Sequence, residues 1–156
     1  MSLRIRPACA ADLTEMSRVL IASITELCAP DHGGKAERLA SWTANKTPEG
    51  VRAMLDNAAL RLFVAELDGR VAAVGAILPA SGEISLNYVD PDARFRGVSK
   101  ALLAALETEL RAHGVVEAQL TSTITARAFY RAAGWTDDAS KVACQGGQGY
   151  RMRKTL

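Results

Sequence analysis

Cysteine and histidine are scarce in this sequence of 156 residues, which contains three cysteines and two histidines. Cys9, Cys28 and Cys144 are widely spaced and odd in number, and they form no CxxC pair and no zinc-like spacing with His32 or His113. This pattern argues against a disulfide framework and against a zinc module. We therefore expect buried or unreactive thiols, a reducing compartment and no bound metal.

Net charge and long apolar runs are equally limited. The formal net charge is only +2, so we expect no whole-surface attraction to nucleic acid or to a membrane. No uninterrupted apolar run approaches the roughly 18 residues that a membrane-spanning helix needs. The first residues, MSLRIRPACAADL, reach charge and proline too early for a signal peptide. These absences predict a cytoplasmic protein.

The composition that remains is that of an ordinary globular domain, with 49% hydrophobic and 23% charged residues. The length suits one sizeable hydrophobic core. Because no linker, repeat or low-complexity segment divides the chain, we predict one domain over residues 1–156.

Hydrophobic periodicity divides the chain into strands and helices. Alternating or continuous apolar runs predict strands at 3–7, 61–67, 70–78, 84–90, 116–122, 135–144 and 149–156. Helical spacing predicts helices at 13–27, 98–113 and 125–134, with one or two short helices between 36 and 58. Asp68-Gly69 predicts a hairpin turn, and the glycine-containing stretches 29–35 and 145–149 predict breaks between elements.

The order of these elements predicts the fold class. Antiparallel hairpins followed by helical crossovers favour an α+β or mixed α/β protein, with a central mixed, mostly antiparallel sheet and helices on both faces. A helical crossover usually links parallel strands. We therefore expect the strands at 84–90 and 116–121 to be parallel neighbours.

The segment VDPDARFRGVSKALLAAL, residues 89–106, places a basic loop between a predicted strand and a predicted helix. The first N–H groups of a helix lack internal partners and attract anions. Gly97 allows close backbone approach, and Arg94, Arg96 and Lys100 add positive charge. A P-loop would need another glycine, and GxGxxG keeps only one glycine of three. The segment predicts a phosphate or pyrophosphate site, or else an ordinary basic loop that caps a helix.

The same segment resembles the acyl-CoA-binding motif of the GNAT superfamily of N-acetyltransferases, V-x-P-x-x-(R/Q)-x-x-G-x-(G/A). The residues that match are Val89, Pro91, Arg94 and Gly97. Ser99 stands where Gly or Ala is usual, and it is still small enough for tight packing.

A second stretch, TSTITARAFYRAAGW, resembles the family's later motif, N-x-x-A-x-x-F-Y-x-x-x-G-F. The residues that match are Ala126, Phe129, Tyr130 and Gly134. Thr123 occupies the Asn position and Trp135 replaces the final Phe. The two motifs are separated by one predicted helix and one predicted strand, as in that family. The resemblance covers most of the chain and is least informative from about residue 28 to residue 60.

The resemblance implies an acetyl-CoA-dependent N-acetyltransferase, in which the primary amine of an acceptor attacks directly within a ternary complex. It places the pantetheine arm in a gap between two central strands that separate at a bulge. There the arm would pair with backbone groups of Asn87, Tyr88 and Val89, one of which could stabilise the oxyanion. The amides implied to hold the pyrophosphate belong to Phe95, Arg96, Gly97, Val98, Ser99 and Lys100. Arg94, Thr123 and Phe129 complete the implied cofactor site.

The resemblance also implies two groups that transfer protons, a tyrosine that acts as an acid and a second residue that acts as a base. Tyr130 matches the tyrosine that protonates the departing thiolate, because a phenol with an ordinary pKa of about 10 stays protonated at neutral pH. Its alternative is a packed helix tyrosine. Glu83 is the first candidate for the base, although an exposed turn carboxylate is its alternative, and Glu66 and His32 follow. No cysteine lies near either motif in the sequence, so a covalent acyl-enzyme is unnecessary.

Other hypotheses stay open. A non-catalytic acyl-CoA-binding sensor or partner module would keep the cofactor site; Thr123 favours this hypothesis and Tyr130 argues against it. A nucleotide-phosphate binder unrelated to CoA is the third hypothesis. The acceptor is expected to be a small-molecule or peptide amine, bound by the helices after the first strand, which carry His32, Arg38, Trp42 and Lys46. Small domains with exposed terminal strands often dimerise, so a homodimer is also open.

Overall fold

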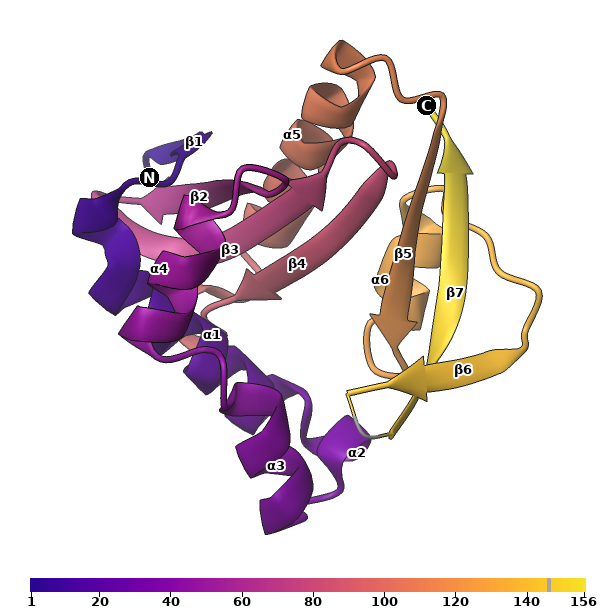
Figure 1. Ribbon diagram of the computed structural model, residues 1–156, viewed down its shortest axis with the longest axis horizontal. Coiled ribbons are helices and arrows are strands. Elements are labelled where there is room, and N and C mark those ends of the chain that lie inside the picture. Colours follow the sequence, from indigo (N-terminus) through magenta and orange to yellow (C-terminus); the bar gives the residue numbers. More distant parts are fainter. Residues whose placement is uncertain (146) are drawn as a thin grey trace.

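Within the residues that the computed structural model describes, 1–145 and 147–156, seven strands form one open sheet in the order β1-β2-β3-β4-β5-β7-β6 (Figure 1). The strands are β1 (Leu3–Pro7), β2 (Arg61–Leu67), β3 (Arg70–Leu78), β4 (Glu83–Val89), β5 (Glu117–Thr123), β6 (Lys141–Cys144) and β7 (Gly147–Thr155). Every neighbouring pair is antiparallel except β4 and β5, which are parallel. The predicted mixed, mostly antiparallel sheet and its parallel pair are confirmed.

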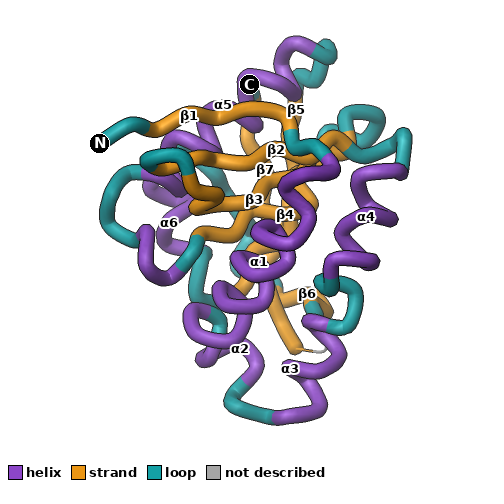
Figure 2. Tube along the Cα trace, turned by 90° about the vertical axis from the view of Figure 1, so that its left-hand side faces the viewer, coloured by secondary structure: helices purple, strands orange, loops and turns teal. Residues whose placement is uncertain are grey.

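Helices cover both faces of this sheet. They are α1 (Leu13–Leu27), α2 (Ala29–His32), α3 (Ala36–Thr43), α4 (Pro48–Asp56), α5 (Val98–Ala112) and α6 (Arg127–Ala132). Figure 2 shows α4 and α6 on opposite sides of the strands. In the described part of the chain, no helix combines the length and the apolar character that crossing a membrane requires.

Two hydrophobic cores lie on the two faces, and β2 contributes to both. Leu62 and Val64 pack with α1 and α4, whereas Phe63 and Ala65 pack with α5. This alternation follows from the two-residue period of a strand. Because both faces of the central strands are buried, β3 is an almost continuous apolar run, buried from Val71 to Ile77.

Gly75 allows α5 to approach β3 closely. A Cβ at this position would lie 2.9 Å from Leu106 Cδ1. Leu102, Leu106 and Leu110 of α5 are fully buried at the same interface. This contact fixes α5 over the sheet, and with it the loop that precedes the helix.

The predicted hairpin between β2 and β3 is confirmed. Asp68 and Gly69 have φ values of 52° and 83° and connect Leu67 to Arg70, which are paired. Two consecutive positive φ angles are typical of the type I′ turn, which matches the twist of the flanking strands.

A bulge and a short pairing separate β4 from β5. Ala76 of β3 pairs with Leu86, but Ile77 pairs with Ile84, so Ser85 is an extra residue in β4. Pairing between β4 and β5 is confined to Glu83 and Gln119. Beyond this pair the two strands diverge, and Figure 1 shows the resulting gap in the middle of the sheet.

Some predicted boundaries differ from the structure. The break predicted at 29–35 contains the short helix α2, which ends at His32 and is followed by Gly33 with a φ of 63°. The strand predicted at 135–144 is reduced to β6, since Asp137 accepts hydrogen bonds from Arg127 and Arg131 and holds this segment as a loop. The turn predicted at 145–149 is partly in β7, and its residue 146 lies outside the described residues.

Candidate active site

The gap between β4 and β5 opens into a cavity of about 700 Å³. Its walls come from the end of α1, from residues 84–89 of β4, from the loop before α5 and from residues 120–123 of β5. Phe129 and Tyr130 of α6 close one side. Both sequence motifs therefore meet in a single cavity.

The two strands in this cavity suit an extended ligand that carries amide groups. Residues 85–89 of β4 and 120–123 of β5 line the cavity without ladder pairs between them. Unpaired strand edges accept an added extended segment through main-chain hydrogen bonds. Thr121, Ser122 and Thr123 add hydroxyl-bearing side chains on the β5 side.

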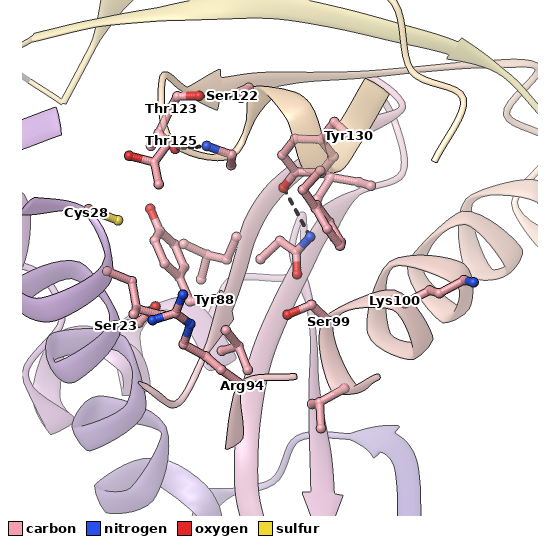
Figure 3. Close-up of a pocket in the computed structure, with 18 of the residues that line it drawn as sticks. Ser23, Cys28, Tyr88, Arg94, Ser99, Lys100, Ser122, Thr123, Thr125 and Tyr130 are labelled. Carbon is pink, nitrogen blue, oxygen red and sulfur yellow. Dashed lines mark hydrogen bonds between the residues drawn. The ribbon is translucent and has the colours of Figure 1, made fainter. Parts of the chain in front are cut away.

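The loop before α5 supplies features that favour an anion. Gly97 is the N-cap residue, has a φ of 76° and makes no side-chain cap, so the first amides of α5 are available to a ligand. Arg94 and Lys100 line the cavity, whereas Arg96 is exposed and is not among its lining residues. Figure 3 shows the Lys100 side chain extending away from Tyr130.

Tyr130 is buried and its phenol oxygen accepts a hydrogen bond from Asn87 Nδ2 at 3.0 Å (Figure 3). Burial raises the pKa of Tyr130 to about 12, although the Asn87 hydrogen bond opposes this effect. The ring packs edge-on against Phe129 and Trp135, with centroids 5.2 and 6.0 Å away. Tyr130 is therefore held in place as a neutral phenol whose own proton is free for another acceptor.

Tyr88 presents a second oriented phenol in the cavity. Its oxygen accepts a hydrogen bond from Trp42 Nε1 at 3.3 Å, and burial raises the pKa of Tyr88 well above its usual range. Figure 3 shows the hydroxyl on the side of Cys28 and Thr125. From the sequence we expected only backbone contacts from Tyr88. The contact with Trp42 could not be predicted, because the two residues lie 46 positions apart in the chain.

Thr123, at the position where the later motif has Asn, makes a hydrogen bond to the main chain. Its Oγ1 accepts a hydrogen bond from the Ala126 amide at 3.2 Å and so supports the turn that leads into α6. Thr123 also lines the cavity. This hydrogen bond therefore helps to fix the start of the helix that carries Tyr130.

The three residues considered for the base are each engaged elsewhere. Glu83 accepts a hydrogen bond from Arg151 Nη1 at 3.0 Å and is not among the cavity-lining residues. Glu66 pairs with Arg6 on β1. His32 is buried, accepts from the Gly34 amide at 3.0 Å through Nδ1, and its Nε2 lies 3.2 Å from the Thr25 carbonyl oxygen.

The carboxylate that does line the cavity is Glu26, near the end of α1, which sequence reasoning missed. It is the only acidic side chain among the described lining residues. Ser23, Glu26 and Leu27 lie at the i, i+3 and i+4 positions of one face of α1. That spacing was a usable signal, but nothing in the sequence distinguishes this face from an ordinary half-exposed one.

Cys28 also lines the cavity, although in the sequence it lies far from both motifs. Its side chain is buried, and burial raises the pKa of this thiol to about 12. The reactive form of cysteine is the thiolate, so at neutral pH Cys28 is a poor nucleophile.

Asp31 of α2 bridges to the far side of the cavity. Its Oδ1 accepts hydrogen bonds from the amides of Ile124 and Thr125 at 2.8 and 3.2 Å, and its Oδ2 accepts one from the Thr125 hydroxyl. These contacts tie α2 to the loop between β5 and α6. They fix the position of α2 relative to the cavity wall that β5 and α6 form.

Comparison with known proteins agrees with this geometry. The family model described as the acetyltransferase (GNAT) domain matches residues 19–156. No curated protein matches the sequence. A GCN5-related N-acetyltransferase structure from Rhodopseudomonas palustris is 24% identical, with a TM-score of 0.86 over 100% of this chain and 97% of that one.

Two further solved structures share the fold. The PaiA N-acetyltransferase from Thermoplasma acidophilum, in complex with coenzyme A, is 19% identical, with a TM-score of 0.81 over 100% of both chains. A ribosomal-protein-alanine N-acetyltransferase from Brucella melitensis is 23% identical, with a TM-score of 0.70 over 98% of this chain and 99% of that one. Because the family model spans most of the sequence, the chain belongs to the GNAT family of acetyl-CoA-dependent acetyltransferases.

Proposed function

We propose that this protein transfers the acetyl group of acetyl-CoA to the primary amine of a small-molecule or peptide acceptor, by direct attack within a ternary complex. The observation that carries the proposal is that one cavity joins the strand gap, the free amides of α5 and the Tyr130 hydroxyl. Acetyl-CoA would supply the acetyl group as an activated thioester. Residues 1–156 would act as one acyltransferase domain.

The residues of the cavity fit this cosubstrate along its length. Backbone groups of Asn87, Tyr88 and Val89 would pair with the two amides of the pantetheine arm. The amides of residues 95–100 would hold the diphosphate, with charge-assisted contacts from Arg94 and Lys100. The name of the PaiA structure states that coenzyme A is bound to a protein of this fold, which supports the donor assignment.

Tyr130 would donate its phenolic hydrogen to the sulfur as the carbon–sulfur bond breaks. Its pKa of about 12 lies above the roughly 8.5 of an ordinary thiol, and each unit of difference opposes full proton transfer by about 1.4 kcal/mol. Tyr130 therefore stabilises the leaving thiolate chiefly as a hydrogen-bond donor. Asn87 would hold the phenol oxygen in place for this contact.

A carboxylate or a water molecule must take the proton that the acceptor amine loses. Glu26 is placed for this role because it lines the cavity on the α1 side. Glu83 stays a weaker candidate, since Arg151 holds its carboxylate outside the lining. The raised pKa of Cys28 supports direct attack, because a neutral thiol forms a covalent acyl-enzyme poorly.

Calorimetric titration with acetyl-CoA, followed by thiol release against a panel of amines, tests the proposal. The panel should contain polyamines, amino acids and short peptides with free N-termini. Binding with amine-dependent release is the expected result. Binding without release for every amine would favour the non-catalytic acyl-CoA-binding module, and absence of binding would refute both hypotheses.

A further inference from the structure

Phe95 is exposed to an unusual degree for a large apolar residue. Its relative exposure is 92%, the highest among the large hydrophobic side chains described. Residues of this size are usually at least partly buried, because exposed apolar surface is unfavourable in water. The Phe95 ring is therefore almost fully exposed to solvent rather than packed against other apolar side chains.

The backbone of Phe95 is also strained. Its φ is 64°, in the left-handed region that a bulky side chain rarely adopts and that glycine enters freely. Strain of this kind persists where the surroundings impose it and is concentrated at ligand-binding sites. A glycine here would relieve the strain and remove the exposed apolar surface, so neither stability nor solubility explains the phenyl ring.

Arg94 pairs with this ring from the same loop. The Arg94 Cζ lies 4.6 Å from the centroid of the Phe95 ring, a cation–π geometry that restrains the ring orientation. Both residues line the rim of the cavity where the loop meets α5. A flat aromatic face, next to two arginines and Lys100, is thus presented beside the amides of α5.

The next step rests on the proposed function. With the pantetheine arm along β4 and the diphosphate at residues 95–100, the remaining part of coenzyme A is an adenosine bearing a 3′-phosphate. This part must leave the cavity at the rim that Phe95 occupies. It combines a planar purine with a dianionic phosphate, and these are the two chemistries that an aromatic ring and basic side chains recognise.

We propose that Phe95 is a stacking platform for the adenine of the coenzyme, and that this contact makes the enzyme select coenzyme A over donors that end at phosphopantetheine. Every nucleobase has a π-face, so stacking needs no hydrogen-bond readout. The Arg94 guanidinium holds the ring ready before the ligand arrives, which reduces the ordering that binding requires.

Isothermal titration with two ligands tests this assignment. Coenzyme A carries the adenosine, whereas 4′-phosphopantetheine lacks it and keeps the arm and one phosphate. Phe95→Leu removes the aromatic face but keeps apolar bulk, and Phe95→Gly removes the ring and also relieves the backbone strain. Phe95→Trp is the matched control, because it keeps an aromatic face.

We expect both Phe95→Leu and Phe95→Gly to weaken coenzyme A binding about tenfold and to leave 4′-phosphopantetheine binding within about twofold of wild type. Phe95→Trp should bind coenzyme A as tightly as wild type. The fluorescence of 1,N6-ethenoadenine coenzyme A should be quenched on binding to wild type and to Phe95→Trp, and much less on binding to the other two variants.

Equal weakening of both ligands by Phe95→Leu would overturn the assignment, since the loop and not the purine contact would then be affected. Unchanged coenzyme A binding by Phe95→Leu would overturn it as well. Failure of the proposed function gives a different result, in which the wild-type protein binds neither ligand.

Discussion

Asn87 Nδ2 lies 3.0 Å from Tyr130 Oη, and this hydrogen bond joins β4 to α6 across the gap in the sheet. Asn87 belongs to the strand that would bind the pantetheine arm, and Tyr130 belongs to the helix that would serve the leaving group. The amide donates and the phenol oxygen accepts, so the phenolic hydrogen must point to a different acceptor. One contact thus couples the position of the donor strand to the direction of the proposed acid.

Replacement of Tyr130 by Phe should lower kcat for thiol release by about 10²- to 10³-fold, the usual range for loss of one hydrogen-bond donor to a developing anion. The dissociation constant of acetyl-CoA, measured by calorimetry, should stay close to that of wild type, because the ring and its packing are kept. Asn87→Ala should give a smaller loss of kcat. An undiminished kcat for Tyr130→Phe would leave Tyr130 as a packing residue only.

The pH–rate profiles of two matched variants, Glu26→Gln and Glu83→Gln, test which carboxylate is the base that takes the proton of the acceptor amine. Glu26 lines the cavity, whereas Glu83 is paired with Arg151 outside it. We therefore expect Glu26→Gln to remove the acidic limb of the kcat/KM profile and Glu83→Gln to leave that limb in place. Loss of the limb in Glu83→Gln alone would restore Glu83 as the base.

Much of the fold followed from the sequence because local signals and global packing agree. Asp68-Gly69 adopts the turn that its residue types favour, and the apolar stripe of α5 packs on the sheet as its spacing predicts. The parallel pairing of β4 and β5 followed from the single crossover helix between them. The motif residues meet in one cavity for the same reason, since each motif joins a strand to a helix at one sheet edge.

What could not be predicted depends on contacts between distant residues. The hydrogen bond between Trp42 and Tyr88 joins α3 to β4, and Asp31 reaches Thr125 from 94 positions away. Glu26 and Cys28, at the C-terminal end of α1, line the same cavity as residues 120–123 of β5, almost 100 positions later in the chain. No local sequence pattern predicts these contacts. Hydrophobic periodicity indicates which face of a helix or strand is apolar, but not which other element packs against that face.

The Asp31 bridge should matter for the acceptor side of the cavity more than for the donor side. Asp31→Ala removes the acceptor of three hydrogen bonds, and we expect about 1 kcal/mol less stability, because the contacts are partly exposed to solvent. The KM for the amine should rise severalfold, while the dissociation constant of acetyl-CoA should change little.

Thr125→Val is the matched control for the bridge, since it keeps the Thr125 amide and the side-chain shape but removes the hydroxyl. Its effect on the KM for the amine should be smaller than that of Asp31→Ala. An equal rise in the acetyl-CoA dissociation constant and in the amine KM would show that the bridge supports the whole cavity rather than its acceptor side.

Asp12 should give a pH-dependent contribution to stability. Its buried carboxylate accepts hydrogen bonds from Arg6 Nη1 and Nη2, both at 2.8 Å, and from the Cys9 amide at 2.9 Å, which tie β1 to the start of α1. The contacts with Arg6 are the main cause that lowers the pKa of Asp12 from 3.8 to about 2. At about 1.4 kcal/mol per pKa unit, this lowering corresponds to roughly 2.5 kcal/mol of stability.

The depressed pKa fixes the sign of the pH dependence. The contribution is complete above the unfolded pKa of 3.8 and is lost as the pH falls through the folded value of about 2. Asp12→Asn should therefore lower the free energy of unfolding in urea by about 2.5 kcal/mol near neutral pH, and by roughly half as much near pH 3. Asp56→Asn, at an exposed position, should change stability little at either pH. A constant difference between Asp12→Asn and wild type at both pH values would contradict the assignment, because a packing defect does not titrate.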